Sequence, residues 1–135
     1  MTLVFSFLYL IFHINSGNEL VVNINGLESN KGQVMVALYN TEKGFPDVQW
    51  KGKITTPTNQ KAQVIFSDLP EGNYAVSFLH DENLNGKMDK NLVGYPKENF
   101  GFSNNPSIKF AAPKFKECLF LVGRGKTTIS INSFF

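Results

Sequence analysis

The segment "DLPEGNYAVSFLHD", residues 68–81, joins a tight turn to a run of regularly alternating side chains. After the turn formers, the larger side chains Tyr74, Val76 and Phe78 occupy every second position and alternate with Ala75, Ser77 and Leu79. Strict alternation is typical of a strand with one face toward a core and one toward solvent. An irregular, Asn-rich segment follows His80. The strand is therefore predicted to end in a loop at a rim, where β-folds commonly place their sites.

The same period of two recurs along the chain. Further alternating runs lie at residues 20–24, 34–39, 62–66, 108–110, 119–121 and 127–131, with turn formers between them. No stretch has a helical stripe, and "NTEKGFPDVQW" (40–50), with Gly44 and Pro46, is expected to be a loop. Short strands at this spacing predict an all-β fold. We expect a single antiparallel β-sandwich of about seven strands, immunoglobulin-like or transthyretin-like, over residues 18–135, with a long ordered loop at one rim.

Composition excludes several classes of protein. The 135 residues are 42% hydrophobic, which suffices for one core, and the formal net charge of +2 is too small and scattered for a nucleic-acid-binding surface. The single cysteine, Cys118, cannot form an intramolecular disulfide. Its apolar neighbours Leu119 and Phe120 predict a buried, structural thiol.

The N-terminal residues 1–17, "MTLVFSFLYLIFHINSG", resemble a secretory signal peptide. The apolar run Leu3–Phe12 is too short to cross a bilayer, and small and polar residues follow it. We therefore expect an exported protein, periplasmic or extracellular, with no transmembrane span in its mature form. No Lys or Arg precedes the apolar run, so a buried first strand is the alternative interpretation.

The segment after His80 carries oxygen-bearing side chains at alternate positions. A calcium loop of the EF-hand kind needs side-chain oxygens at positions 1, 3, 5 and 9, glycine at 6 and a backbone carbonyl at 7. This pattern is met in order by Asp81, Asn83, Asn85, Gly86, Lys87 (through its carbonyl) and Asp89. The spacing predicts a Ca²⁺ site of modest affinity, about 10⁻⁴–10⁻³ M.

The match fails at position 12, where Leu92 replaces the usual bidentate Glu. The missing oxygen is expected from Glu98, Asn91 or a water. The alternative interpretation is a plain turn in which Asn and Asp side chains cap their own backbone. If calcium is the ligand, Asp81→Ala and Asp89→Ala are expected to lower the melting temperature in calcium but not in chelator.

Aromatic residues crowd the rest of the loop. Tyr95, Phe100 and Phe102 either fold back over the end of the sandwich or form an exposed surface for a partner, with Ser103 available for polar contacts. A second functional hypothesis is therefore a metal-free glycan- or peptide-binding sandwich that uses Trp50 together with these three aromatics.

No catalytic arrangement is expected. One histidine, His80, remains beyond the N-terminal segment, and no phosphate loop, zinc signature or Cys–His pair is present. His80 is predicted to anchor the loop by hydrogen-bonding backbone. A hydrolase that uses loop carboxylates is the least favoured hypothesis.

The segment "HDENLNGKMDKNLVGYPKENFGFSNNP", residues 80–106, resembles the signature of an uncharacterised group of exported bacterial proteins, domain of unknown function 2141. The likeness extends more loosely over the chain from about Asn18. Its motif falls on His80, Asp81, Asn83, Asn85, Gly86, Lys87, Asp89, Gly94, Pro96, Gly101, Phe102 and Ser103. The resemblance implies a signal peptide, a β-sandwich and the Asp/Asn/Gly loop, but no activity. Residues 69–89 also resemble, more generally, transthyretin-like and carboxypeptidase-regulatory-like sandwiches.

Together these features predict a non-catalytic exported β-sandwich module. Calcium held by residues 81–89 and Glu98 would order the rim, which would contact an unidentified protein or glycan through Tyr95, Phe100, Phe102 and Ser103.

Overall fold

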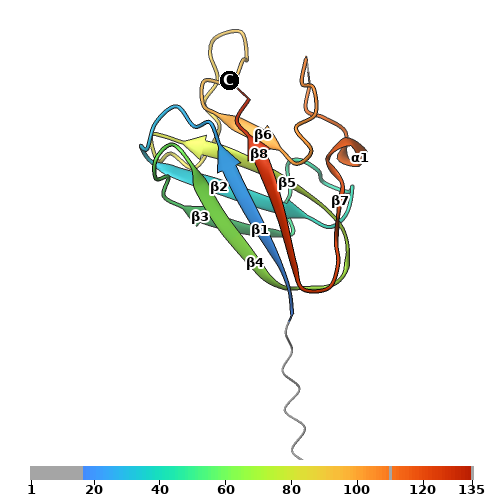
Figure 1. Ribbon diagram of the computed structural model, residues 1–135. Coiled ribbons are helices and arrows are strands. Elements are labelled where there is room, and N and C mark those ends of the chain that lie inside the picture. Colours follow the sequence, from blue (N-terminus) through green and yellow to red (C-terminus); the bar gives the residue numbers. More distant parts are fainter. Residues whose placement is uncertain (1–16, 110, 135) are drawn as a thin grey trace, which may run out of the picture.

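The computed structural model describes residues 17–109 and 111–134, which form two packed β-sheets (Figure 1). The strands are β1 (Asn18–Asn25), β2 (Gln33–Tyr39), β3 (Lys51–Thr55), β4 (Ala62–Leu69), β5 (Gly72–Asp81), β6 (Phe100–Phe102), β7 (Phe120–Val122) and β8 (Lys126–Asn132), with one short helix, α1 (Phe115–Cys118). The predicted signal peptide lies outside the described residues, except for Gly17.

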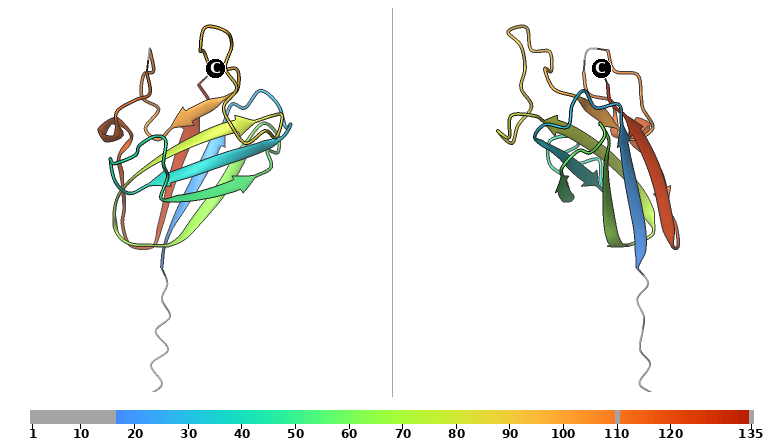
Figure 2. Two further views of the ribbon diagram at one scale, coloured as in Figure 1. Left: turned by 180° about the vertical axis from the view of Figure 1, so that it is seen from behind. Right: turned by 60° about the vertical axis from the view of Figure 1, so that its left-hand side comes forward.

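The two layers differ in size. One sheet has the order β4-β1-β8, and the other has the order β3-β2-β5-β6, with β7 also paired to β5 (Figure 2). The predicted β-sandwich is confirmed, with one difference in pairing: β1 and β8 run parallel, while the other strand pairs are antiparallel.

The alternating positions fill the space between the sheets. The runs on five strands contribute inward-facing apolar side chains: Leu20, Val22 and Ile24 of β1, Val34, Val36 and Leu38 of β2, Val64 and Phe66 of β4, Tyr74, Val76 and Phe78 of β5, and Ile131 of β8. Each fully buried side chain of this size stabilises the fold by about 1.5–3 kcal/mol. The core thus follows from the period of two in the sequence.

A smaller cluster covers the outer face of β5. Tyr39, Ala75 and Cys118 are buried there, with four partly buried residues, Ala37, Phe45, Phe102 and Phe115, packed against them. Cys118 is fully buried, which confirms its predicted structural role, and burial raises the pKa of its thiol to about 11. Both faces of β5 are therefore covered around Ala75.

One expected strand is absent over its described residues, and three observed elements were not predicted. The run at 108–110 does not form a strand over its described residues, because Ile108 lies in a coil. The strands β3 and β6 were not predicted, since the side chains of Lys51–Ile54 are exposed and β6 is only three residues long. The helix α1 was not predicted either. Residues 40–50 form turns, as expected.

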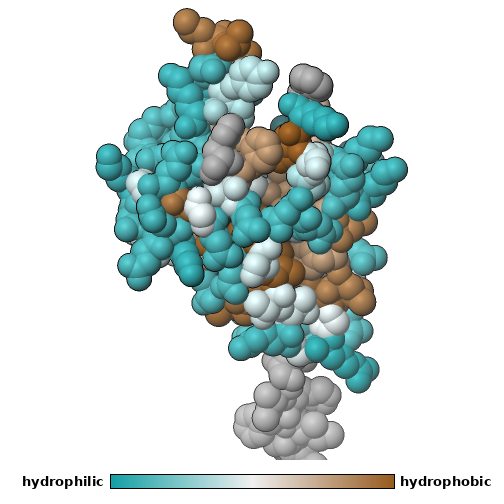
Figure 3. Space-filling view, turned by 45° about the horizontal axis from the view of Figure 1, so that its top comes forward, coloured by the Kyte–Doolittle hydropathy of each residue, from teal (hydrophilic) through white to brown (hydrophobic). Residues whose placement is uncertain are grey.

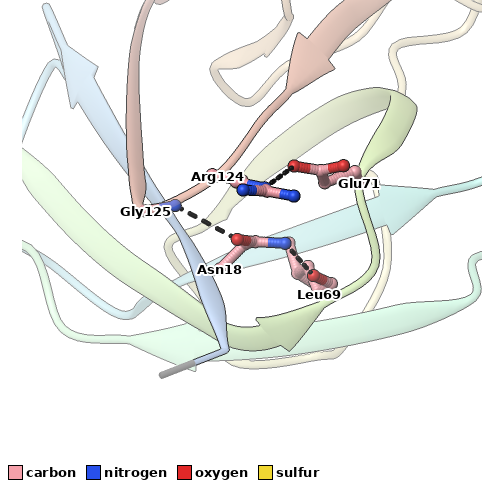
Figure 4. A network of polar contacts seen from close by, with 5 residues as sticks. All are labelled: Asn18, Leu69, Glu71, Arg124 and Gly125. Carbon is pink, nitrogen blue, oxygen red and sulfur yellow. Dashed lines mark hydrogen bonds and ion pairs between the residues drawn. The ribbon is translucent and has the colours of Figure 1, made fainter. Parts of the chain in front are cut away.

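The end of the sandwich opposite the loop is tied by polar contacts (Figure 4). The Asn18 side chain donates to the Leu69 carbonyl at 2.9 Å and accepts from the Gly125 amide at 3.1 Å. Arg124 and Glu71 form an exposed ion pair at 3.5 Å. These contacts join the start of β1 to the turns β4–β5 and β7–β8, far from the loop that leaves β5.

Candidate functional site

The candidate site begins where β5 ends. Strand β5 leads into residues 82–99, and the chain returns as β6, which pairs with β5 through Leu79 and Phe100. The excursion projects from one end of the sandwich, the end at which β8 also terminates (Figures 1 and 2). It is therefore one long loop between adjacent antiparallel strands, fixed at both ends by the sheet.

Two buried residues fix the base of this loop. The His80 ring Nε2 lies 2.6 Å from the Lys31 carbonyl, and the His80 amide donates to the Asn99 carbonyl at 2.8 Å. The side chain of Asn99 in turn accepts from the Glu28 amide at 2.9 Å. The prediction that His80 anchors the loop through backbone is confirmed.

Asp81 organises the first turn of the loop. Its carboxylate accepts hydrogen bonds from Gln33 Nε2 at 2.8 Å, from the Gly86 amide at 2.8 Å and from the Asn85 amide at 3.2 Å. The residue is fully buried. Burial alone would raise the pKa of Asp81, but these three hydrogen bonds, together with electrostatic attraction to the neighbouring His80, hold the pKa below its ordinary value. Asp81 is therefore a buried anion that curls residues 82–86 around itself.

Successive Asx turns continue the curl. The Asn83 side-chain oxygen accepts from the Asn85 amide at 3.3 Å, and the Asn85 side-chain oxygen accepts from the Lys87 amide at 3.0 Å. Gly86 adopts a φ of +77°, which glycine tolerates and most residues do not. Both Asn side chains also donate through Nδ2 to the Asp89 carboxylate. The side chains of positions 3, 5 and 9 thus hydrogen-bond one another, and the Asn85 amide links them to the carboxylate at position 1.

Glu98 closes this group from the returning segment. The residue is only 5% exposed, and its two oxygens accept from the amides of Glu82 at 2.7 Å and Asp89 at 3.1 Å. The carboxylate therefore clamps both limbs of the curl. Of the sources considered for the missing oxygen, Glu98 lies at the curl, whereas the Asn91 side chain caps the far tip by accepting from the amides of Val93 and Tyr95.

The charges at the curl are not balanced by cationic side chains. Among residues 17–109 and 111–134, the one ion pair is Arg124–Glu71, so Asp81, Asp89 and Glu98 have no Lys, Arg or His nitrogen within 4.0 Å. In the same residues, no group of three or more His, Cys, Asp and Glu side chains is arranged to hold a metal ion. Calcium binding at this loop stays a prediction.

The predicted partner-binding residues do not form one exposed surface, although the rings of Phe100 and Phe102 contact each other edge to face. Phe100 is 9% exposed, and Ser103 is buried, with its hydroxyl donating to the Cys118 carbonyl and accepting from the Val76 amide at 3.0 Å. Phe102 is half-buried in the cluster beside β5. Phe100 and Phe102 thus fold back onto the sandwich, while Tyr95 is exposed on the loop.

Trp50 lies elsewhere. Its ring stacks on Tyr74 with centroids 6.0 Å apart, near the end of β5 remote from Asp81. The aromatic surface of the glycan- or peptide-binding hypothesis is therefore not assembled from Trp50, Tyr95, Phe100 and Phe102.

Sequence reasoning missed the contacts made by residues 28–33. Gln33 pairs across the sheet with Asp81, and Ser29 donates to Glu82 at 2.9 Å. Gly32 has a φ of +67°, and a Cβ there would overlap the Asp81 carbonyl and Glu82 Cα. The sequence carries only a weak indication of these contacts, namely a polar residue, Gln33, at the start of an apolar strand.

Fold and loop together define a class: a β-sandwich with an Asx-rich loop curled around a buried aspartate at one rim. The chain belongs to the family described as "Uncharacterized protein conserved in bacteria (DUF2141)", whose model matches residues 22–130. This confirms the resemblance seen in the sequence. No curated protein and no solved structure matches the chain. Within the described residues, no helix is both long and apolar enough to cross a membrane.

Proposed function

We propose that this protein is a non-catalytic, exported β-sandwich module that binds Ca²⁺ in the loop formed by residues 81–89, with Glu98 as the additional carboxylate. The bound ion would stiffen the rim between β5 and β6, and the rim would mediate an interaction. Export rests on the N-terminal sequence alone.

The observation that carries the proposal is the pair of buried carboxylates at the curl, Asp81 and Glu98. Hydrogen bonds hold the Asp81 carboxylate in its charged form although it is buried, and no Lys, Arg or His nitrogen of the described residues lies within 4.0 Å of it, so the curl keeps negative charge that a cation could compensate. Asp89 adds a third carboxylate hydrogen-bonded within the same loop. A divalent cation would offset this concentration of negative charge.

The chemistry of the available donors fits a hard cation. Ca²⁺ takes six to eight oxygen ligands from carboxylates, amide side chains, backbone carbonyls and water. The Asx turns leave each Asn oxygen with a second lone pair, and the carbonyl of Lys87 belongs to the same curl. In the present arrangement Asn83 and Asn85 hydrogen-bond Asp89 through their amide nitrogens, so binding would replace those contacts with oxygen–metal contacts.

Thermal unfolding of the full chain in calcium and in chelator tests the proposal. With a dissociation constant of about 0.3 mM, calcium at about 10 mM would add about 2 kcal/mol to the free energy of unfolding. For a domain of this size that is a rise of roughly 8 °C. Glu98→Gln should abolish most of the rise while keeping an acceptor for one loop amide.

The matched control is Asp47→Asn, which removes one exposed carboxylate outside the loop. This variant should respond to calcium like the unmodified protein. Equal melting temperatures in calcium and chelator for the unmodified protein, or an undiminished rise in Glu98→Gln, would contradict the proposal.

A further inference from the structure

The outer half of the β5–β6 loop is a small, ordered hairpin. Lys90 and Pro96 form an antiparallel bridge, and the Asn91 amide donates to the Tyr95 carbonyl at 2.8 Å. The amides of Val93 and Tyr95 each donate to the Asn91 side-chain oxygen at 3.0 Å. Residues 91–95, which we call the tip, are therefore held in a defined shape at the extreme end of the projecting loop.

The tip presents apolar side chains to solvent. Leu92 is 109% exposed relative to its reference state, Val93 is 80% exposed and Tyr95 is 58% exposed. Figure 3 shows a hydrophobic knob standing above a mostly hydrophilic surround. The apex of this hydrogen-bonded hairpin is convex and apolar, and exposed hydrophobic patches commonly mark interaction sites.

Basic residues flank the tip. Lys87, Lys90 and Lys97 are all exposed, and the intervening acid, Asp89, is less exposed and hydrogen-bonded by Asn83 and Asn85. The segment 87–97 therefore carries three exposed cations around an apolar apex. Long lysine side chains can reach outward from such a position while the apex is buried.

We propose that this tip inserts into the interface of an anionic lipid bilayer. Leu92 and Val93 would enter the boundary between headgroups and acyl chains, Tyr95 would sit at headgroup level, and the flanking lysines would contact lipid phosphates. Apolar area and attraction to anionic lipid act together in interfacial binding. The inference goes beyond the proposed function and needs no bound calcium, so either can fail without the other.

The shape of the tip favours a bilayer over a protein partner. A protein that received this apex would need a pocket matched to a narrow, convex knob, whereas lipids rearrange around any convex projection. Lys90 and Lys97 lie beside the tip, whereas Glu82 and Glu98 meet at the base of the loop, so the end that would contact an anionic surface carries positive charge. A protein partner is the alternative, and it predicts no response to lipid.

The test must report locally, because the apolar run Leu3–Phe12 also has affinity for lipid. A single tryptophan is placed at the tip by Leu92→Trp in a Trp50→Phe background of the full chain. Vesicles of phosphatidylcholine, with or without phosphatidylglycerol, are added in chelator, so that calcium cannot bridge protein to lipid. We expect a blue shift of emission with the anionic vesicles and quenching by bromine-labelled acyl chains.

Val48→Trp in the same background is the matched control, since Val48 is 68% exposed on a different loop. That tryptophan should not respond. Adding Lys90→Gln and Lys97→Gln to the tip reporter should weaken its response by about fivefold per lysine. Absence of quenching at position 92, or equal quenching at 92 and 48, would overturn the proposal.

Discussion

Replacing Asp81 with alanine should destabilise the protein even when calcium is absent. The carboxylate accepts three hydrogen bonds, from Gln33, Asn85 and Gly86, and the residue is fully buried. Alanine would leave all three donors without this acceptor. At about 1 kcal/mol for each lost hydrogen bond, the free energy of unfolding should fall by about 3 kcal/mol.

Asp89→Ala provides the contrast within the same loop. Asp89 accepts from the Asn83 and Asn85 side chains, in contacts exposed to water. Water can replace them, so this substitution should cost less than about 1 kcal/mol in chelator. The structure therefore changes the expectation from sequence, which had both substitutions silent in chelator.

Urea unfolding in EDTA measures the difference. Trp50 stacks on Tyr74, so its fluorescence should change when the sandwich opens. The prediction is a midpoint clearly lower for Asp81→Ala than for Asp89→Ala, with equal slopes. A loss below about 0.5 kcal/mol for Asp81→Ala would refute the idea that this carboxylate organises the loop.

The lowered pKa of Asp81, the close backbone approach at Gly32 and the burial of Cys118 each have a measurable consequence. Hydrogen bonding outweighs burial and lowers the pKa of Asp81, so the Asp81 carboxylate should stabilise the fold fully above the ordinary carboxyl pKa of about 3.9 and lose this effect as pH falls through the folded pKa. The difference in urea midpoint between the unmodified protein and Asp81→Asn should therefore disappear in acid. A difference that stays constant with pH would contradict this. Gly32→Ala should lower the free energy of unfolding by about 3 kcal/mol, because its Cβ would overlap backbone atoms at a positive φ. Gly94→Ala, also at a positive φ but in open space, should lower it by about 1 kcal/mol. Similar losses in the two variants, measured by urea unfolding, would be inconsistent with a close approach at Gly32. With its pKa raised to about 11 by burial, the Cys118 thiol should resist Ellman's reagent at neutral pH until the protein is unfolded, and rapid labelling of the native protein would contradict its burial.

Much of the fold could be predicted because its core depends on a local signal. Alternation identified the strands that supply most of the interior, from Leu20 of β1 to Ile131 of β8. The edge strand β3 was missed because its exposed residues Lys51–Ile54 show no apolar alternation. This segment is extended because it pairs with β2, not because its own residues favour a strand. The parallel pairing of β1 with β8 joins segments about a hundred residues apart, and no local pattern specifies it.

The sequence indicated the group of polar residues at 81–89 but not the residues of the preceding turn and strand β2 that contact it. The spacing from Asp81 to Asp89 could be recognised because those residues are consecutive on one curled segment. The contacts of Gln33 and Gly32 depend on strand β2 lying beside β5, which a single sequence does not specify. The sequence did not indicate which aromatic side chains of the loop would be buried: Phe100 is buried, whereas Tyr95 is exposed.

If the carboxylates at the curl, Asp81, Asp89 and Glu98, together bind one calcium ion, isothermal titration of the full chain with calcium should detect that binding. We expect a saturable heat with one ion per chain, a dissociation constant of about 10⁻⁴–10⁻³ M, and loss of that heat in Glu98→Gln but not in Asp47→Asn. An absence of saturable heat in the unmodified protein, or the same isotherm in Glu98→Gln, would contradict it.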